Sequence, residues 1–252
     1  MYKYLLIISM LIIYLNVAAL CQISSFNTLD INQLKIYLPN TGIIENTDNI
    51  FADAVFWPGG VNAYQQLFWN IKFMWAGYTG NELRVNGLSG VLQPGKIMDN
   101  GLSDDPRKER YRVYRILRNW ESTPYGPDRD QLEKDYNEWP VEDGAPWVDK
   151  DGDGIFTRGV DQPDFTGDEV LFYVANDLDS SRAYGYASKP MGLEFQVTLY
   201  AFNRSGILGD AAFEKIKIIN KGRENIKDMY FGISGDADLG ENTDNYTGYD
   251  TT

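Results

Sequence analysis

The ten residues LEFQVTLYAF, from Leu193 to Phe202, alternate apolar side chains with polar ones. This period of two is typical of a β-strand, because successive side chains point to opposite faces of a sheet. Phe195, Val197 and Leu199 therefore share one face, and we predict that they point into the core. The residues between them share the opposite face: Glu194, Gln196, Thr198 and Tyr200. The segment is therefore predicted to be a half-buried strand.

Three more segments of this kind lie close to that strand in the sequence. They run from Val170 to Ala175, from Phe213 to Asn220 and from Ile226 to Ile233, and a turn from Asn220 to Arg223 separates the last two. Half-buried alternating strands joined by short turns are typical of antiparallel sheets. We therefore predict a mainly β protein with an antiparallel β-sandwich-like fold.

The N-terminal half carries weaker strand signals. Gln66 to Tyr78 has the period of a strand and is dense in aromatic residues, and Ile50 to Trp57 is predicted to be a short strand. Asn81 to Val91 is predicted to be a hairpin, with Asn86-Gly87 as its turn. Asn32 to Ile50 is polar and has no strong periodicity, so we predict an irregular entry segment there.

The segment from Asp128 to Trp139 is predicted to be a short helix. Leu132 and Tyr136 lie four residues apart, and acidic residues come early in the segment. The preceding segment, Tyr111 to Trp120, fits both a helical face and a strand. We favour a strand that ends near Leu117.

The charge balance restricts the possible partners. The chain has 252 residues, with 36 acidic and 23 basic side chains and a formal net charge of −13. Such an acidic surface disfavours nucleic acids and anionic membranes, whose phosphates need Lys and Arg. We therefore expect no nucleic-acid partner and, once the leader described below is removed, no membrane contact.

The sequence contains no histidine. This excludes Ser-His-Asp and Cys-His catalysis, histidine general bases and histidine-ligated zinc. Any catalysis would depend on carboxylates, Tyr, Lys or a group activated by Ca²⁺. The sequence leaves open whether the protein is an enzyme and favours a non-enzymatic role.

Residues 1–21 have the pattern of a secretory leader. Lys3 supplies a positive charge, the run from Leu5 to Leu15 is almost wholly apolar, and Ala19-Leu20-Cys21 suits cleavage before Gln22. Cleavage after Ala19 and a retained membrane anchor are the alternatives. The interpretation predicts a secreted or cell-surface protein.

Cys21 is the only cysteine, so cleavage after it would leave a mature chain with none. An exported chain of this size without disulfides is typical of bacteria rather than of disulfide-stapled animal modules. Residues 22–252 are then predicted to form a single β-rich domain, which can be the N-terminal part of a longer protein.

The loop from residue 149 to residue 161 is the main candidate site. Asp149, Asp151 and Asp153 stand at alternate positions, with Gly152 and Gly154 between and after them. They match positions 1, 3 and 5 of a D-x-D-x-D-G loop, and Ca²⁺ prefers six to eight oxygen ligands held flexibly. Closely spaced carboxylates repel one another unless a cation neutralises them. We predict a structural Ca²⁺ site here, the alternative being a solvated Asp-Gly turn.

The rest of the predicted ligand set is less regular. Ile155 would supply a backbone carbonyl, and Thr157 or a water would complete the next position. Where an EF-hand has a bidentate Glu, this chain has Val160, and Asp161 follows one residue late. The flanking sequence does not predict EF-hand helices either. We therefore predict a calcium loop with Asp161 as a further ligand, and not an EF-hand.

A second acidic set occurs near the C-terminal end of the sequence: Asp236, Asp238, Glu241, Asp244 and Asp250. It could hold another ion, but we favour an acidic loop at the end of a strand. Asn176-Asp177-Leu178-Asp179 is favoured as a turn.

Several motifs recur in the order found in a known group of proteins. They are Gly144-Ala145-Pro146-Trp147-Val148 with the Asp-rich loop, Asn176 to Asp179, Gly192 to Phe202, Ile219 to Gly222, and Asp236 to Gly240. This half of the chain resembles uncharacterised exported proteins of Bacteroidetes- and Ignavibacteria-like bacteria. Those proteins commonly end in a type IX secretion sorting domain, which is not found in this sequence. The loop itself is similar to the short calcium loops of dockerin and thrombospondin type 3 repeats. The resemblance implies location and architecture, and names no reaction.

Two functions remain after these exclusions. The first is an exported or cell-surface β-rich protein, non-enzymatic, with a structural Ca²⁺ loop. The second is a carbohydrate-binding or carboxylate-dependent glycan-cleaving module, which implies a glycan or cell-surface partner. A cleft lined by Trp57, Trp69, Trp75 or Trp120 would favour the second function, and burial of all four would favour the first.

Overall fold

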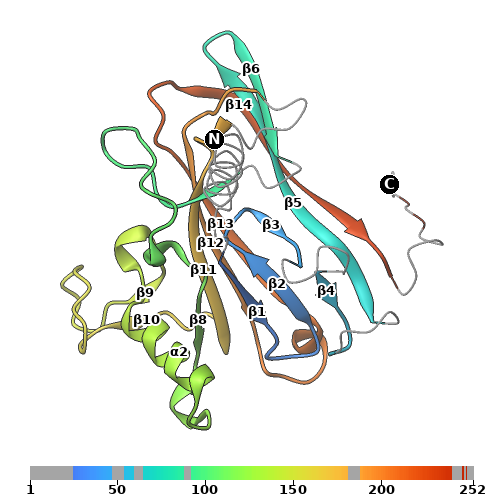
Figure 1. Ribbon diagram of the computed structural model, residues 1–252, viewed down its shortest axis with the longest axis vertical. Coiled ribbons are helices and arrows are strands. Elements are labelled where there is room, and N and C mark those ends of the chain that lie inside the picture. Colours follow the sequence, from blue (N-terminus) through green and yellow to red (C-terminus); the bar gives the residue numbers. More distant parts are fainter. Residues whose placement is uncertain are drawn as a thin grey trace, which may run out of the picture.

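The computed structural model describes residues 25–46, 54–59, 65–87, 92–180 and 188–239, together with Tyr246 and Gly248. Two antiparallel sheets pack face to face, and a third layer covers the outer face of one of them. In Figure 1 these layers lie side by side, with the helical layer on the left. The mainly β, sandwich-like fold predicted from the sequence is therefore confirmed.

The first sheet is organised around one long strand, β5 (Gln66–Thr79). Its path runs β1 (Phe26–Leu29), β2 (Lys35–Pro39), β4 (Val55–Phe56), β5 and β14 (Ile226–Ala237), and β3 (Ile43–Ile44) and β6 (Glu82–Gly87) also pair with β5. In Figure 1, β5 and β14 run side by side along the right-hand edge. All of these pairings are antiparallel.

The second sheet contains the strand with which the sequence analysis began. Its path runs β13 (Ala212–Asn220), β12 (Leu193–Ala201), β11 (Glu169–Asn176) and β7 (Gln93–Pro94), and β8 (Tyr114–Leu117) also pairs with β11. The connection after Asn220 therefore joins two different sheets, because β13 pairs with β12 whereas β14 pairs with β5.

The main core lies between the two sheets. Phe195, Val197 and Leu199 point into it and are at most 2% exposed, as predicted. From the first sheet Phe73 and Trp75 meet them, and both are almost fully buried. Apolar burial is the main favourable term in folding, so this interface is the principal source of stability.

A third layer packs on the other face of the second sheet. It contains α2 (Pro127–Asn137), the short 3-10 helices η1 (Glu109–Tyr111), η2 (Trp120–Ser122) and η3 (Val141–Asp143), and a two-stranded ladder of β9 (Trp147–Val148) and β10 (Gln162–Pro163). A further 3-10 helix, η5 (Ile207–Asp210), precedes β13. Trp139, Tyr114 and Phe172 form the centre of a second apolar cluster between this layer and the sheet. The predicted helix and the predicted strand ending at Leu117 are both confirmed.

Because of this layer, the prediction of a half-buried β12 was wrong. Glu194, Gln196 and Thr198 are buried like the apolar residues of the opposite face. Gly144 approaches the sheet so closely that a Cβ there would lie 2.1 Å from the side chain of Gln196. The buried charge of Glu194 is compensated by an ion pair with Lys221 at 2.7 Å and by a hydrogen bond from the backbone N–H of Ile97 at 2.8 Å. β11 and β12 are thus buried on both faces, whereas alternate residues of β13 are exposed.

Two N-terminal predictions are also corrected. The segment Asn32 to Ile50 contains β2 and β3. β2 is five residues long and β3 only two, too short for a clear period, and they form strands by pairing with β1, β4 and β5. Asn86 and Gly87 lie within β6 opposite Trp75 and Met74, and the turn falls at Gly80, with φ of 62°. Gly87 is required for a different reason: a Cβ there would lie 2.3 Å from the carbonyl oxygen of Phe73.

The remaining predictions concern segments that the structure describes only in part. The predicted leader, residues 1–21, lies outside the described residues. Of the predicted strand from Ile50 to Trp57, the pair Val55–Phe56 is described as β4. Among the described residues, no helix has the length and hydrophobicity needed to span a membrane.

Candidate metal centre and the neighbouring pocket

The Asp-rich loop begins and ends on a rigid base. β9 and β10 pair antiparallel, with Trp147 opposite Pro163 and Val148 opposite Gln162, so the two ends of the loop lie side by side. Asp161 fixes them further: its Oδ1 accepts the N–H of Lys150 at 2.8 Å and its Oδ2 accepts the N–H of Thr157 at 2.7 Å. The loop is therefore anchored at its ends and exposed along its length.

Within the loop, three carboxylates come together. Asp149, Asp151 and Asp153 are exposed, and each has a carboxylate oxygen that lies within 4.8 Å of one from each of the other two. Two ligands on opposite sides of a Ca²⁺ ion are about 5 Å apart, since Ca–O bonds measure roughly 2.3–2.6 Å. One ion could therefore contact all three side chains, and the cluster could hold a metal ion.

Backbone N–H groups give the loop its shape. Asp149 accepts the N–H of Gly152 at 2.6 Å and that of Gly154 at 2.9 Å, and Asp153 accepts the N–H of Ile155 at 2.7 Å. Gly152 and Gly154 have φ values of 78° and 77°, which other residues rarely adopt. The two glycines therefore allow the chain to curl around the three carboxylates.

The electrostatics of the loop match this crowding. The backbone N–H of Gly154 is the main cause that lowers the pKa of Asp149. Partial desolvation raises the pKa of Asp151, and the negative charges of Asp153, Asp161 and Asp149 add to that shift. A cation at this point would relieve the repulsion between like charges.

The other three predicted ligands lie in different surroundings. Ile155 is 67% exposed and its N–H binds Asp153. Thr157 binds Asp161 through its N–H, and its carbonyl accepts the N–H groups of Val160 and Asp161. Asp161 is buried and is not part of the three-carboxylate cluster. Their coordination of an ion stays a prediction.

Among the described residues, the other acidic sets form no second cluster of three carboxylates. Asp236 lies in β14 opposite Asn70, and Glu241, Asp244 and Asp250 lie outside the described residues. Asp177 is buried, and its carboxylate accepts the N–H groups of Met191, Gly192 and Leu193. Asp177 therefore anchors the start of β12.

A pocket of about 530 Å³ adjoins the metal loop. The loop contributes Phe156 and Arg158, β8 of the second sheet contributes Tyr114, and the third layer contributes the other walls. The remaining lining residues are Glu109, Arg110, Arg112, Tyr114, Glu138, Trp139, Pro140, Val141 and Glu142. Trp139 and Tyr114 belong to the second apolar cluster, so these two lining residues are fixed by packing within that cluster.

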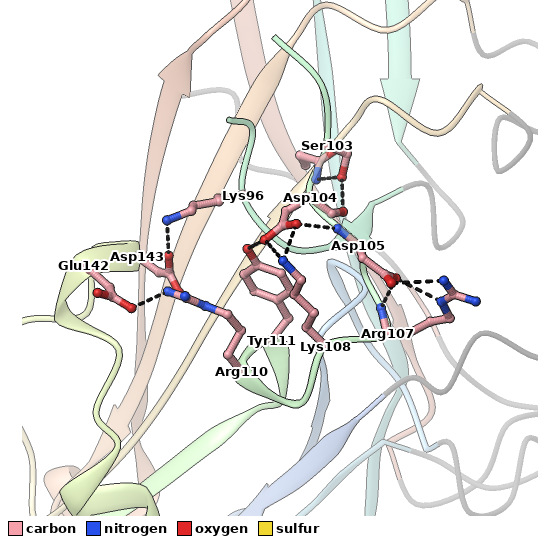
Figure 2. Close-up of polar contacts among 11 residues, drawn as sticks. Lys96, Ser103, Asp104, Asp105, Arg107, Lys108, Arg110, Tyr111, Glu142 and Asp143 are labelled. Atoms are coloured by element: carbon pink, nitrogen blue, oxygen red, sulfur yellow. Dashed lines mark hydrogen bonds and ion pairs between the residues drawn. The ribbon is translucent and has the colours of Figure 1, made fainter. Parts of the chain in front are cut away.

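Figure 2 shows how one wall of this pocket is fixed. The guanidinium of Arg110 binds Oδ2 of Asp143 through Nη2 at 2.6 Å and through Nε at 3.1 Å, and it also binds Glu142 at 2.6 Å. Asp143 is fully buried, and its second oxygen lies 3.0 Å from Nζ of Lys96. Arg110 is thus held by a buried carboxylate while about a third of its side chain stays exposed.

The same view shows the anchor behind Arg110. The hydroxyl of Tyr111 donates to Asp104 at 2.6 Å, and Lys108 reaches the same carboxylate at 2.7 Å. Bonds from Lys108 and then Tyr111 lower the pKa of Asp104 to about 2. This network fixes η1, which carries Arg110, against the loop that precedes it.

A second buried carboxylate fixes Arg112. Its Nε donates to Asp135 of α2 at 2.9 Å, and its Nη2 donates to Glu138 at 2.9 Å. The guanidinium carbon lies 4.0 Å from the ring centroid of Tyr114, a cation–π geometry. This wall of the pocket, formed by Arg110 and Arg112, was not predicted from the sequence. The carboxylates that bind the two arginines lie 23 to 33 residues away, and no local spacing indicates the pairing.

The four tryptophans considered for sugar stacking do not gather in one cleft. Trp75 is 2% exposed in the sandwich core, and Trp69 is half-buried in β5. Trp57 is exposed at 43%, and its indole N–H donates to Asp210 at 2.8 Å. Trp120 packs on Tyr136 in the third layer, with the ring centroids 5.7 Å apart. None of the four lines the pocket beside the metal loop.

Comparison with protein-family models, with curated proteins and with solved structures found no match. The class of the protein is therefore defined by its fold and its candidate site alone: an antiparallel β-sandwich with a three-carboxylate loop and an adjoining pocket. The resemblance to exported bacterial proteins stays a prediction.

Proposed function

We propose that the protein is an exported or cell-surface β-rich module, non-enzymatic, whose loop at residues 149–161 binds a structural Ca²⁺ ion. The observation that supports this function is the convergence of Asp149, Asp151 and Asp153 within 4.8 Å on an exposed, glycine-shaped loop. Oxygen-only ligands suit a hard cation, and extracellular modules bind Ca²⁺ with dissociation constants of about 0.1–1 mM. Millimolar Ca²⁺ is available outside the cell, which agrees with the leader predicted at residues 1–21.

In this proposal the ion stabilises the conformation of the loop and takes no part in a reaction. The loop carries Phe156 and Arg158 to the pocket wall, and Phe156 packs edge-on against Trp147 with ring centroids 5.5 Å apart. An ion that joins the three carboxylates would reduce the freedom of the residues between Lys150 and Thr157. The gain in stability follows the mass-action relation between ligand concentration and dissociation constant.

Terbium luminescence tests the metal site directly. Tb³⁺ replaces Ca²⁺ at oxygen-ligand sites, and Trp147, two residues before Asp149, is placed to sensitise its emission. We expect sensitised emission in the wild type that added Ca²⁺ displaces, and its loss in Asp151→Asn. Asp99→Asn removes an exposed carboxylate elsewhere and should leave the emission unchanged. Emission that survives Asp151→Asn would contradict the proposed site.

Export is tested separately by the N-terminus of the mature protein. The leader pattern predicts that protein recovered outside the cytoplasm begins at Gln22, or at Leu20 if cleavage follows Ala19. Intact Met1 in a soluble cytoplasmic pool would contradict export without bearing on the metal site.

The second candidate function, a carbohydrate-binding module, is favoured by one observation, the polar pocket beside the metal loop. Cleavage of a glycan has less support. Glu109, Glu138 and Glu142 each form an ion pair with a basic side chain. The bond from Lys134 lowers the pKa of Glu109, whereas a glycosidase needs one carboxyl group that stays protonated.

A further inference from the structure

The pocket beside the metal loop carries balanced charge. Its lining contains the arginines Arg110, Arg112 and Arg158 and the glutamates Glu109, Glu138 and Glu142, and three positive charges minus three negative charges leave none. A fixed anion would meet three carboxylates, and a cation would meet three guanidinium groups. Neither sign of charge is favoured, so a ligand of this pocket should be polar and uncharged.

The polar groups of the wall are held in place before any ligand arrives. The buried carboxylates of Asp143 and Asp135 fix Arg110 and Arg112, and these arginines in turn bind Glu142 and Glu138. Side chains that are fixed in this way lose little conformational freedom on binding. The wall therefore presents preformed donors and acceptors side by side.

Two donors in this pocket make no hydrogen bond or ion pair among the described residues. The hydroxyl of Tyr114 makes no hydrogen bond there, although the residue is 3% exposed and belongs to the second apolar cluster. Burial raises the pKa of Tyr114 to about 12, so its hydroxyl stays protonated at neutral pH. Arg158 is exposed, and its guanidinium carbon lies 5.8 Å from the ring centroid of Phe156. It makes no ion pair within the described part of the chain.

We propose that this pocket binds a neutral sugar. Sugar hydroxyls both donate and accept hydrogen bonds, so they match a wall on which guanidinium and carboxylate groups alternate. Tyr114 and Arg158 supply the unused donors, and Phe156 offers a half-buried ring for the apolar face of the sugar. The volume of about 530 Å³ is within the usual range for small-ligand pockets.

This inference deepens the carbohydrate-binding candidate and does not depend on Ca²⁺ binding by the loop. The probes are neutral oligosaccharides of two to four units, built from glucose, xylose, mannose or galactose, and oligogalacturonate as a charged counterpart. Binding to the full chain is measured by calorimetric titration and by ligand-observed NMR, in Ca²⁺ and again in chelator. Metal binding is read from terbium emission alone, so the failure of either proposal is recognised separately.

Tyr114→Phe and Arg158→Ala are the test variants. Each should weaken binding of a neutral oligosaccharide about three- to tenfold, the effect expected for one lost hydrogen bond. Neither should unfold the protein, because neither variant removes a hydrogen bond or an ion pair within the described part of the chain. Arg158→Ala loses only the cation–π contact with Phe156. Tyr125→Phe and Arg204→Ala are the matched controls, since both residues are exposed and neither lines the pocket.

Three results would overturn the proposal. The first is that no neutral oligosaccharide binds at concentrations up to about 10 mM. A dissociation constant above that value would be too weak for recognition. The second is tighter binding of oligogalacturonate than of any neutral sugar, which would identify an anion site. The third is an equal loss of affinity in the control variants, which would place the sugar elsewhere on the surface.

Discussion

The rings of Trp75 and Phe195 meet across the two sheets, with their centroids 4.8 Å apart and their planes inclined at 49°. Trp75 comes from β5 of the first sheet and Phe195 from β12 of the second, and both are almost fully buried. A tilted pair at this distance contributes about 0.5–1.5 kcal/mol beyond its buried area. The contact shows that Trp75 of β5 belongs to the core, as Phe73 does, whereas Trp69 is half-buried and Tyr78 is exposed.

Phe195→Ala should therefore destabilise the protein by about 3–5 kcal/mol, the usual cost of removing a buried aromatic side chain. Ile207→Ala is a matched control, because Ile207 is 87% exposed and should change stability by roughly 0.5 kcal/mol or less. Urea unfolding measures both variants. Equal stabilities for the two variants would refute this account of the core.

The buried carboxylate of Glu169 on β11 links the second sheet to the residues that follow β1, and it leads to a second prediction. Glu169 is fully buried and binds Nε of Arg115 at 2.5 Å and the N–H groups of Asp30 and Ile31 at 2.9 Å. Glu169→Ala should cost about 3–5 kcal/mol, because it leaves Arg115 and two N–H groups without their carboxylate.

Asp128→Ala removes a partner of the same arginine at the surface. Its carboxylate lies 3.1 Å from Arg115 but is 66% exposed, so the loss should stay below about 1 kcal/mol. The denaturant midpoints of Glu169→Ala and Asp128→Ala measure the two losses of stability. A loss for Asp128→Ala as large as that for Glu169→Ala would show that burial does not control the strength of this pair.

A third prediction concerns pH. Glu214 of β13 has one carboxylate oxygen, Oε1, that is inaccessible and lacks a hydrogen-bond partner, and burial raises the pKa of Glu214 to about 7. A buried titratable group interacts with Glu214: the hydroxyl of Tyr173 on β11, whose pKa the negative charge of Glu214 helps to raise. The folded protein therefore keeps a proton on Glu214 that the unfolded chain releases near pH 4.5. Stability should fall as pH rises from about 4.5 to about 7.

Comparison with Glu214→Gln isolates this contribution. Between pH 5 and pH 8 the wild type should lose roughly 2–3 kcal/mol relative to the variant, following the factor of about 1.4 kcal/mol per pKa unit. Unfolding free energies of both proteins at several pH values provide the measurement. Parallel pH profiles for the wild type and Glu214→Gln would show that the carboxyl group is not buried as described.

The fold could be predicted only in part from the sequence. The alternation in β12 predicted the inward face of Phe195, Val197 and Leu199, because a period of two is a local property. The burial of Glu194 and Gln196 on the other face was not predictable, since it depends on a layer that begins about 80 residues upstream. Gly87 shows the same limit: its close approach to Phe73 depends on pairing with another strand, whereas its sequence context is typical of a turn.

The candidate site divides in the same way. Asp149, Asp151 and Asp153 were predicted to converge because the spacing of a short loop determines its geometry, and the three carboxylates do form a cluster. The pocket beside them depends on arginines that buried acids of α2 and η3 hold in place. Such pairings between distant segments leave no local pattern in the sequence.

The central claim is that the Asp-rich loop binds Ca²⁺, and a melting curve tests it most directly. The midpoint is compared in chelator and in about 5 mM Ca²⁺, for the wild type and for Asp151→Asn. With a dissociation constant of about 0.1–1 mM, the ion should stabilise the wild type by roughly 1–2 kcal/mol and raise its midpoint by about 2–8 °C. Asp151→Asn should melt at the same temperature in both buffers. A wild-type midpoint that does not change with Ca²⁺, or an equal rise in Asp151→Asn, would contradict the claim and leave the loop as a solvated Asp-Gly turn.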